Sequence, residues 1–298
     1  MTVQSIHHVS LLTRHNQLNI DFYTKVLGLR MVKNTVNQDN TRMYHYYYGD
    51  YAGRPGSVVT FFPVPRLGHR YDNDAYFETV SLQIPEGSLN YWKKRLNHFS
   101  VPFTESEHAL TLQDPDNVTL ILTETATPAL EEEFSVKNEI PKEFQITAIQ
   151  STELHVANFN QTIQFFESFL DWKNKDGYFY LKNNQWIKIL PSNTTENSRN
   201  GRGSMDHIAF AVADEEELKQ LHEKAKKQGW EIEKLVSRGY FKSLYIREPG
   251  GHLRIEFATM NPGFSIDEPL ETLGESFALP PFLAPKREEI LERLYPFE

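Results

Sequence analysis

Two kinds of strand-then-helix unit occur along the chain, and each kind occurs twice. In the first kind, a strand-like stretch at residues 6–12 precedes apolar residues at positions 22, 23, 26 and 27, which this spacing places on one face of a helix. The same helical spacing returns at positions 165, 166, 169 and 170, after a strand-like stretch at residues 146–156. These stretches therefore predict two copies of one structural unit.

The second kind of unit has a different helical spacing. A strand-like stretch at residues 79–84 precedes Leu89, Trp92 and Leu96, and a stretch at residues 207–212 precedes apolar residues at 218, 221 and 225. After each of the four helices come β-branched and aromatic runs broken by Gly, Asn and Asp, which are typical of strands joined by turns. The sequence therefore predicts four β-α-β-β modules.

The predicted fold is α+β, with the four modules in two pseudo-symmetric halves. We expect an N-terminal domain at residues 1–125, containing modules 1 and 2, and a C-terminal domain at residues 145–260, containing modules 3 and 4. An acidic, proline-containing linker at residues 126–144 separates them. Residues 261–298 form a proline-containing tail, which we expect to end in a short amphipathic helix and to pack on the body.

Composition narrows the function classes. The chain has 298 residues with 31 Lys and Arg against 40 Asp and Glu, a net charge of −9, which disfavours a nucleic-acid partner because few cations would neutralise phosphates. No stretch approaches the roughly 18 apolar residues of a membrane span, and the N-terminus lacks a signal-peptide pattern, so a cytoplasmic protein is expected. Cysteine is absent, so any metal must be held by N and O ligands. Homo-oligomer formation is left open.

Positions at which the repeats differ point to a metal site. His8 of module 1 corresponds to Ser151 of module 3, and His207 of module 4 corresponds to Thr79 of module 2. In the closing strands of modules 4 and 2, Glu256 corresponds to Leu122. Pairing module 1 with module 4 would gather His8, His207 and Glu256. Two imidazoles and one carboxylate on one face form the facial triad that suits non-haem Fe(II) and O₂ chemistry.

The number of protein ligands bears on the reaction. Aligning Pro55-Gly56 with Pro249-Gly250 places Phe62 opposite Glu256, so no carboxylate is expected at a fourth ligand position. Glyoxalase-I-type isomerisation usually uses four protein ligands, whereas ring cleavage requires room for substrate oxygens and O₂. The sequence therefore favours ring cleavage.

Two other histidines require comment. His155 shares strand parity with Ser151 and would complete a site if modules 3 and 4 paired directly. However, it lies 10 residues before Phe165 whereas His8 lies 14 residues before Phe22, a displacement of about 13 Å along a strand. His7 neighbours His8 and should point to the opposite face of the sheet unless the strand is bulged.

The motifs in combination resemble the vicinal oxygen chelate superfamily of glyoxalases, bleomycin-resistance proteins and extradiol dioxygenases. The nearer resemblance is to the ring-cleaving dioxygenases that act on hydroquinones, and it covers nearly the whole chain. The matching segments are Ile6-His7-His8-Val9-Ser10, Arg238-Gly239-Tyr240-Phe241 with Tyr245, the strand that ends in Glu256, Gly263-Phe264 with Asp267-Glu268, and Leu279-Pro280-Pro281.

This resemblance implies Fe(II), or in some members Mn(II), held by His8, His207 and Glu256. It also implies that His7, Ser10, Arg238 and Tyr245 line the substrate pocket, and that Tyr245 binds or deprotonates the substrate hydroxyl, with His7 as the other candidate proton acceptor. Relatives often carry a second histidine before the module 4 ligand. This chain has Asp206 there, so an acid–base role of that position is in doubt. A contact between Asp206 and the substrate is still expected.

The function expected from these observations is O₂-dependent ring cleavage of a hydroquinone or catechol, with the small aromatic diol and O₂ as partners. Two alternatives stay open: a metal-dependent lyase or isomerase of the glyoxalase type, and a non-catalytic protein of the same fold that binds a small aromatic molecule. Metal content separates the binding protein from the two enzymes. Uptake of O₂ with a diol separates the dioxygenase from the lyase.

Overall fold

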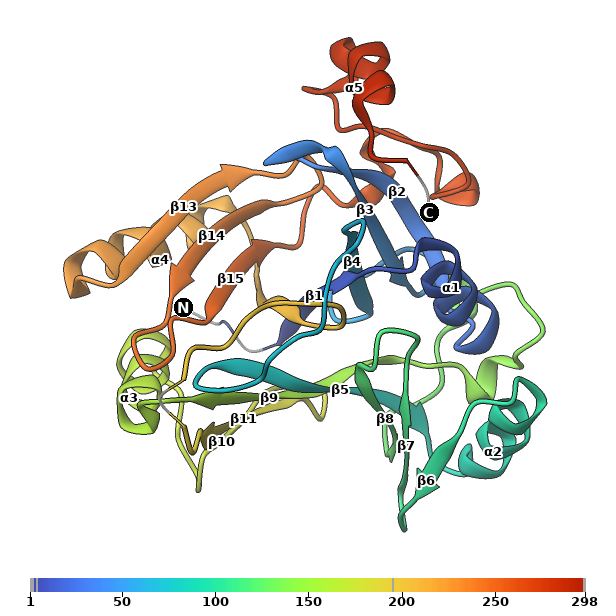
Figure 1. Ribbon diagram of the computed structural model, residues 1–298, viewed down its shortest axis with the longest axis horizontal. Coiled ribbons are helices and arrows are strands. Elements are labelled where there is room, and N and C mark those ends of the chain that lie inside the picture. Colours follow the sequence, from blue (N-terminus) through green and yellow to red (C-terminus); the bar gives the residue numbers. More distant parts are fainter. Residues whose placement is uncertain (1–2, 4, 195, 297–298) are drawn as a thin grey trace.

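The structure is a computed structural model that describes residues 3, 5–194 and 196–296. The outermost residues of the predicted N-terminal domain and of the tail, including part of the N-terminus on which the signal-peptide expectation rests, lie outside the described residues. The described chain forms two curved β-sheets that lie one above the other in Figure 1. The expected α+β fold of four modules is confirmed.

The first sheet combines modules 1 and 4 and has eight strands within the described residues. In spatial order these are β13 (Glu231–Ser237), β14 (Lys242–Arg247), β15 (Arg254–Thr259), β12 (Met205–Val212), β1 (Ile6–Thr13), β4 (Val58–Pro63), β3 (Asn40–Gly49) and β2 (Arg30–Asn37).

The second sheet combines modules 2 and 3 and has seven strands in the described part of the chain. Their order is β10 (Tyr178–Tyr180), β11 (Trp186–Pro191), β9 (Ala148–Val156), β5 (Tyr76–Pro85), β8 (Thr119–Thr125), β7 (Ala109–Gln113) and β6 (Phe103–Glu105). The predicted pairing of module 1 with module 4 is therefore confirmed.

One helical segment accompanies each module. These segments are α1 (Asn16–Asp21) continued by the π-helical η1 (Phe22–Val26), α2 (Leu89–His98), α3 (Phe159–Leu170) and α4 (Glu215–Gln228). The Asp214 side chain caps α4 by accepting a hydrogen bond of 2.9 Å from the Glu217 N–H, and Gly229 ends it at a φ of +74°. The apolar helix faces join residues of both sheets in one hydrophobic core.

The core leaves one face of β1 free for chemistry. Ile6, Val9 and Leu11 of β1 belong to the shared core, whereas His8 and Leu12 line a cavity on the other face of the sheet. Side chains alternate between the two faces of a strand, which separates Val9 and Leu11 from His8 and Leu12. Ile6 and His8 would share a face by this alternation, but a bulge lies between them. The fold thus uses one face of the central strand for stability and the other for the candidate site.

A local two-fold relationship connects β1 and β12. These strands are antiparallel, with His8 opposite Ala209 and Ser10 opposite His207, so His8 and His207 take equivalent positions. In the second sheet, Ser81 lies opposite Ser151, which confirms that Ser151 and Thr79 are the counterparts of the two histidines.

The predicted partners of Glu256 in the other modules are wrong by one or two residues. Glu256 lies opposite Ala209, two residues beyond the partner of His207. The matching position in β4, two residues beyond Val58, is Thr60 and not Phe62, and the matching position in β8 is Ile121 and not Leu122. The turn before β15 is longer than those before β4 and β8, so alignment on the proline shifted the register. Neither Thr60 nor Ile121 carries a carboxylate, so the expectation that no carboxylate occupies these two positions still holds.

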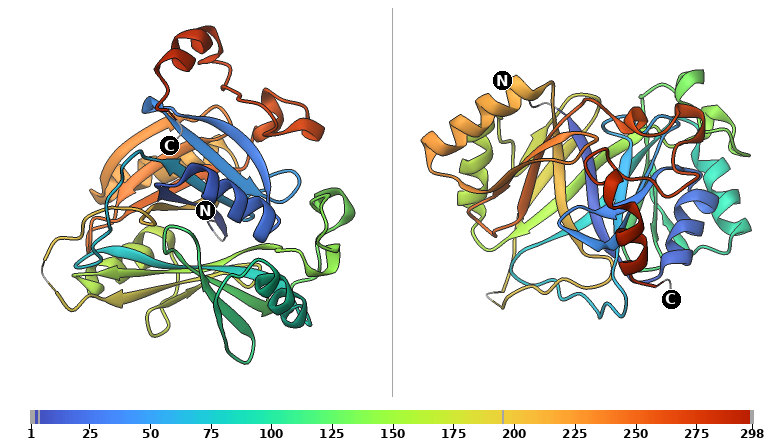
Figure 2. Two further views of the ribbon diagram at one scale, coloured as in Figure 1. Left: turned by 45° about the vertical axis from the view of Figure 1, so that its right-hand side comes forward. Right: turned by 90° about the horizontal axis from the view of Figure 1, so that it is seen from above.

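The tail runs back over the first sheet. It contains the short helices η4 (Phe264–Ile266), η5 (Leu270–Thr272) and η6 (Ala284–Lys286) and the amphipathic helix α5 (Arg287–Arg293). Two further short helices, η2 (Glu132–Phe134) and η3 (Lys142–Phe144), lie in the linker between the two halves. Ile290 of α5 and Leu283 pack against Val36 of β2. Figure 2 shows the tail along the side of the molecule that carries β2 and β3. Among the described helices, none is long and apolar enough to cross a membrane.

Candidate metal centre

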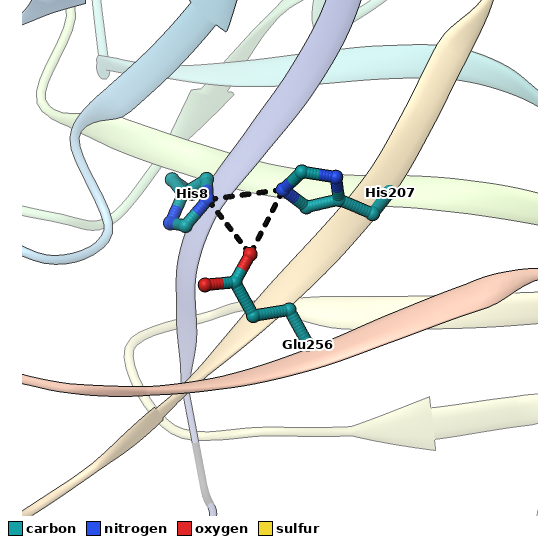
Figure 3. Close-up of side chains that lie close together, drawn as sticks. All are labelled: His8, His207 and Glu256. Atoms are coloured by element: carbon teal, nitrogen blue, oxygen red, sulfur yellow. Dashed lines mark hydrogen bonds and ion pairs between the residues drawn. The ribbon is translucent and has the colours of Figure 1, made fainter. Parts of the chain in front are cut away.

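His8, His207 and Glu256 converge from three adjacent strands of the first sheet, β1, β12 and β15 (Figure 3). His8 Nε2 lies 3.3 Å from His207 Nε2 and 3.3 Å from Glu256 Oε2, and His207 Nε2 lies 2.8 Å from Glu256 Oε2. All three side chains are buried, Glu256 completely. The structure therefore brings together the three residues that the repeat comparison singled out.

The bulge in β1 turns His7 toward the same site. The two neighbouring imidazoles contact each other edge to face, and their Nδ1 atoms are 2.9 Å apart. His7 Nε2 lies 3.3 Å from the Thr259 carbonyl oxygen, which can only accept, so His7 carries its proton on Nε2. His7 Nδ1 is then the acceptor for the Nδ1–H of His8. This arrangement leaves the lone pair of His8 Nε2 directed at the triad.

Asp206 fixes the other histidine in the same way. Its Oδ2 lies 2.6 Å from His207 Nδ1 and accepts a hydrogen bond of 2.6 Å from Arg254 Nη1, while the rest of the Arg254 guanidinium binds Glu233. Burial would raise the pKa of the Asp206 carboxyl, but its contacts with His207 and Arg254 hold it far below its usual range. An ionised Asp206 only accepts, so His207 donates from Nδ1 and keeps Nε2 free.

Three acceptor atoms thus meet in a buried space. With both Nε2 atoms unprotonated, neither oxygen of Glu256 has a hydrogen-bond donor among the described residues. Burial would raise the pKa of the Glu256 carboxyl, but the two imidazoles hold it well below its usual range. Burial lowers the pKa of His207, yet the Asp206 and Glu256 carboxylates outweigh burial and raise it, so that in the absence of a cation a proton on His207 Nε2 compensates the Glu256 charge. A bound metal ion would take the place of that proton. The site therefore favours a positive charge among the three atoms.

These residues fit a divalent metal ion. Metal–ligand bonds of about 2.0–2.2 Å that meet at right angles place neighbouring ligand atoms roughly 3 Å apart, the separation seen here. Orienting partners on the far nitrogen of each imidazole are usual for metal-binding histidines. His8, His207 and Glu256 would hold the ion. His7 and Asp206 would orient its ligands, a role for which sequence reasoning gave no signal.

A cavity of about 110 Å³ opens beside the triad. A cavity of about 150 Å³ accommodates a benzene ring, so this space is of the same order but smaller than an enclosed ring-binding cavity. Its lining residues are His8, Leu12, Asn37, Gln38, Asp39, Met43, His45, Tyr47, Phe62, Asp206, His207, Arg238, Phe241, Tyr245 and Arg254. Of the predicted pocket residues, Arg238, Tyr245 and Asp206 line this cavity, whereas His7 and Ser10 lie behind its wall.

Arg238 and Tyr245 form one unit on the cavity wall. Arg238 Nε donates a hydrogen bond of 3.2 Å to the Tyr245 hydroxyl, and its Nη2 binds Asp39 Oδ2 at 2.9 Å. Burial raises the pKa of Tyr245 well above its usual value, and the nearby Glu256 carboxylate adds to this, while Arg238 opposes it. The phenol therefore keeps its proton at neutral pH and can donate a hydrogen bond.

Sequence reasoning missed the cavity residues on β3, which are Met43, His45 and Tyr47. His45 Nε2 lies 2.9 Å from Thr60 Oγ1, which in turn lies 2.7 Å from Ser10 Oγ, so Ser10 reaches the cavity wall through this chain. Tyr47 lies opposite Thr60 as Tyr245 lies opposite Glu256, which makes the two tyrosines counterparts. A comparison of these hairpin strands between modules 1 and 4 would have found Tyr47.

His155 lies apart from the triad. It belongs to β9 of the second sheet, where its Nε2 is 2.6 Å from Glu78 Oε2 and its ring stacks on Tyr76. The alternative in which modules 3 and 4 pair directly is therefore excluded by the strand order.

Comparisons with known proteins agree with the fold and cover the whole chain. MhqA of Bacillus subtilis strain 168, named provisionally as a ring-cleaving dioxygenase, is 36% identical over the full length of both chains. The chlorohydroquinone/hydroquinone 1,2-dioxygenase of Sphingobium indicum is 29% identical over 98% of this chain and 96% of its own.

Solved structures give the same picture. A provisionally named dioxygenase from Bacillus subtilis superposes with a TM-score of 0.88 at 29% identity, over all of this chain and 98% of that one. Glyoxalase I from Zea mays shares the fold, with a TM-score of 0.60 at 11% identity over 86% of this chain and 92% of its own. The sequence profile of the Glyoxalase/Bleomycin resistance protein/Dioxygenase superfamily matches residues 5–81 and 148–257. The chain therefore belongs to the Glyoxalase/Bleomycin resistance protein/Dioxygenase superfamily.

Proposed function

We propose that this protein is an Fe(II)-dependent ring-cleaving dioxygenase that acts on a hydroquinone or a catechol. The observation that carries the proposal is the convergence of two imidazole Nε2 atoms and one carboxylate oxygen in a buried site beside a cavity of about 110 Å³. Relatives of full length that are named as ring-cleaving and hydroquinone dioxygenases support it. His8, His207 and Glu256 are the proposed ligands, with Mn(II) as the alternative ion.

Bound Fe(II) would supply binding positions for a substrate oxygen and O₂ and the electron transfer between them. The chain's own residues prepare the substrate. The Tyr245 hydroxyl, held by Arg238, donates a hydrogen bond to a substrate oxygen. The ring lies among the apolar and aromatic side chains of Phe62, Tyr47 and Phe241, which also keep bulk water from the site.

Orientation of the ligands is the task of His7 and Asp206. Each holds the Nδ1–H of one ligand histidine, so that both Nε2 lone pairs face the same point. His7 uses both of its nitrogens for this, since Nε2 is at the Thr259 carbonyl. His7 therefore acts as a positioning residue and does not take the proton of the substrate hydroxyl.

The lyase alternative is disfavoured by the residue at the fourth ligand position. In the strand register this residue is Thr60, and its hydroxyl is already engaged by Ser10 and His45. The binding-protein alternative assigns no role to the contacts of His7 and Asp206 that direct the Nε2 atoms of His8 and His207 toward Glu256. Neither alternative has an observation of its own in its favour.

The test is O₂ uptake by iron-loaded protein. The chain is purified anaerobically, loaded with Fe(II), and offered methylhydroquinone, catechol, or the hemithioacetal of methylglyoxal and glutathione in parallel. The proposal expects iron-dependent O₂ consumption with a diol. Absence of uptake with either diol at full iron occupancy would overturn it, and an absorbance change with the hemithioacetal alone would indicate the lyase.

A pair of variants links that activity to the site. His8→Ala is expected to lose both bound iron and O₂ uptake. His155→Ala, a matched removal of a histidine from the pseudo-equivalent strand of the other sheet, is expected to retain both. Retention of iron and activity by His8→Ala would show that modules 1 and 4 do not form the site.

A further inference from the structure

The tail contacts one turn of module 4 through four of its residues. The turn, residues 238–241, joins β13 to β14, and we call it the 238–241 turn. The Phe264 ring packs on the rings of Tyr240 and Phe241, with centroids 5.4 and 6.4 Å apart. The Tyr240 hydroxyl donates a hydrogen bond of 2.9 Å to Asp267 Oδ2. Phe264 and Asp267 thus hold both aromatic residues of the turn.

The two other contacts involve the backbone of the turn, and the first of them is between Pro280 and Gly239. Gly239 has a φ of +81°, and a Cβ at this position would overlap the Pro280 ring. On the other side, Gly263 N–H donates a hydrogen bond of 2.8 Å to the Tyr240 carbonyl. The tail therefore fixes the backbone of the turn as well as its side chains.

A buried lysine of module 1 anchors this part of the tail. Lys33 on β2 is completely buried, and its Nζ lies 2.6 Å from Asp267 Oδ1, in contact with Glu268 Oε2, and 5.0 Å from the centre of the Tyr240 ring. Removing one partner of such a buried pair is strongly destabilising, because the remaining charge is left without compensation. The charges of Lys33, Asp267 and Glu268 thus hold the tail at a defined position.

The 238–241 turn supplies two residues of the candidate site. Arg238 holds the Tyr245 hydroxyl and Asp39 at the cavity wall. Phe241 lines the cavity, and its ring lies against both His7 and His8, with centroids 5.1 and 5.4 Å apart. A shift of the turn would therefore reach the ligand His8 through Phe241, and the substrate contact through Arg238.

We propose that Lys33, Asp267 and Phe264 are positioning residues of the metal centre, which act through Phe241 and Arg238. The inference rests on the proposed metal site, because it assigns to the tail the task of holding the wall of that site. The segment Gly263–Glu268, singled out in the sequence as a motif without a role, obtains one here.

The experiment measures Mn(II) affinity of the apoprotein by isothermal titration calorimetry, which requires no turnover. Asp267→Ala removes the partner of Lys33 and of the Tyr240 hydroxyl while Glu268 remains. We expect it to weaken Mn(II) binding about 10-fold, the lower end of the range for residues that orient metal ligands. Ile290→Ala, which loosens the far end of the same tail, is the matched control and is expected to leave the affinity unchanged.

A double-mutant cycle separates positioning from general destabilisation. If Asp267 acts through Phe241, the variant Asp267→Ala/Phe241→Ala binds Mn(II) no more weakly than Phe241→Ala alone. Additive losses would overturn the inference, and so would wild-type affinity in Asp267→Ala. Should Asp267→Ala not fold, Tyr240→Phe keeps every charge and is expected to shift the affinity in the same direction by a smaller factor.

Failure of the proposed function gives a different result. If the wild-type protein binds neither Mn(II) nor, under anaerobic conditions, Fe(II), the metal site itself is refuted, and the positioning role with it. If the wild type binds Mn(II) and the tail variants bind it equally well, only the positioning role is refuted.

Discussion

Thr60 in β4 occupies the position that Glu256 occupies in β15. The equivalence follows from the strand register, because each residue lies two places beyond the partner of a ligand histidine, His8 or His207. A nearly symmetric scaffold thus carries a carboxylate on one side of the site and a hydroxyl on the other. The hydroxyl is tied to Ser10 and His45, so three protein side chains in place of four are available to the proposed metal ion.

This asymmetry predicts different effects of two substitutions on metal binding. Glu256→Gln removes the anionic ligand and is expected to weaken Fe(II) or Mn(II) binding by more than the roughly 10–100-fold typical of residues that only orient ligands. Thr60→Val removes the hydroxyl and is expected to leave metal affinity unchanged. Titration of each folded variant with Mn(II) checks both expectations, and a loss in Thr60→Val as large as that in Glu256→Gln would mean that the site has four ligands.

The triad could be predicted because the four modules can be aligned with one another, and residues that differ between them stand out. His8 and His207 stand out against Ser151 and Thr79, and strand alternation assigns both to one face. The position of Glu256 relative to its counterparts could not be predicted as well, since turn lengths before the closing strands differ between modules. Alignment on a proline therefore chose Phe62 where the hydrogen-bonded register selects Thr60.

Other parts of the site depend on tertiary structure that no local pattern reveals. The bulge that brings His7 beside His8 is a backbone irregularity with no distinct sequence signal. His45 and Tyr47 lie in an aromatic strand whose alternation is equally typical of ordinary sheet packing. The contact between Asp267 and Lys33 joins residues far apart in the chain, and only the fold shows it.

Asp206 provides a prediction about metal affinity without loss of a ligand. Asp206→Ala removes the acceptor for His207 Nδ1–H and is expected to weaken metal binding about 10–100-fold. Glu233→Gln is the matched control, because it alters the other partner of Arg254 but touches neither histidine. Equal affinities of Asp206→Ala and wild-type protein would show that this carboxylate does not orient His207.

Tyr245 and Tyr47 predict a difference in substrate handling. Tyr245→Phe removes a hydrogen-bond donor held by Arg238, and the loss of about 0.5–1.5 kcal/mol for one hydrogen bond corresponds to a roughly 2–10-fold lower kcat/KM for the diol. Metal affinity is expected to stay unchanged. Tyr47→Phe, at the counterpart position, serves as the comparison, and an effect in Tyr47→Phe alone would assign the substrate contact to β3.

Asp114 provides a prediction on stability that is independent of the site. Its carboxylate lies in the N-terminal half, where Oδ1 accepts hydrogen bonds of 2.8 and 2.9 Å from the Asp116 and Val118 N–H groups and Oδ2 accepts one of 3.0 Å from the Tyr23 hydroxyl. Burial outweighs these bonds and raises the pKa of Asp114 to about 7. The folded state therefore takes up a proton at a higher pH than the unfolded chain, in which the carboxyl titrates near about 3.9.

The sign of the pH dependence follows from this difference. The free energy of unfolding falls as the pH rises from about 4 to about 7, because the unfolded chain then has Asp114 ionised while the folded chain still holds it protonated. The contribution of Asp114 to stability is therefore present at acidic pH and lost at neutral pH. Asp114→Asn removes this pH dependence. The difference in free energy of unfolding between Asp114→Asn and wild type is therefore expected to increase by roughly 2–3 kcal/mol from pH 5 to pH 8, since each pH unit below the folded pKa contributes about 1.4 kcal/mol. Urea unfolding at both pH values measures the difference. Asp176→Asn, at an exposed position, is the control, and an equal stability difference between Asp114→Asn and wild type at the two pH values would contradict a raised pKa.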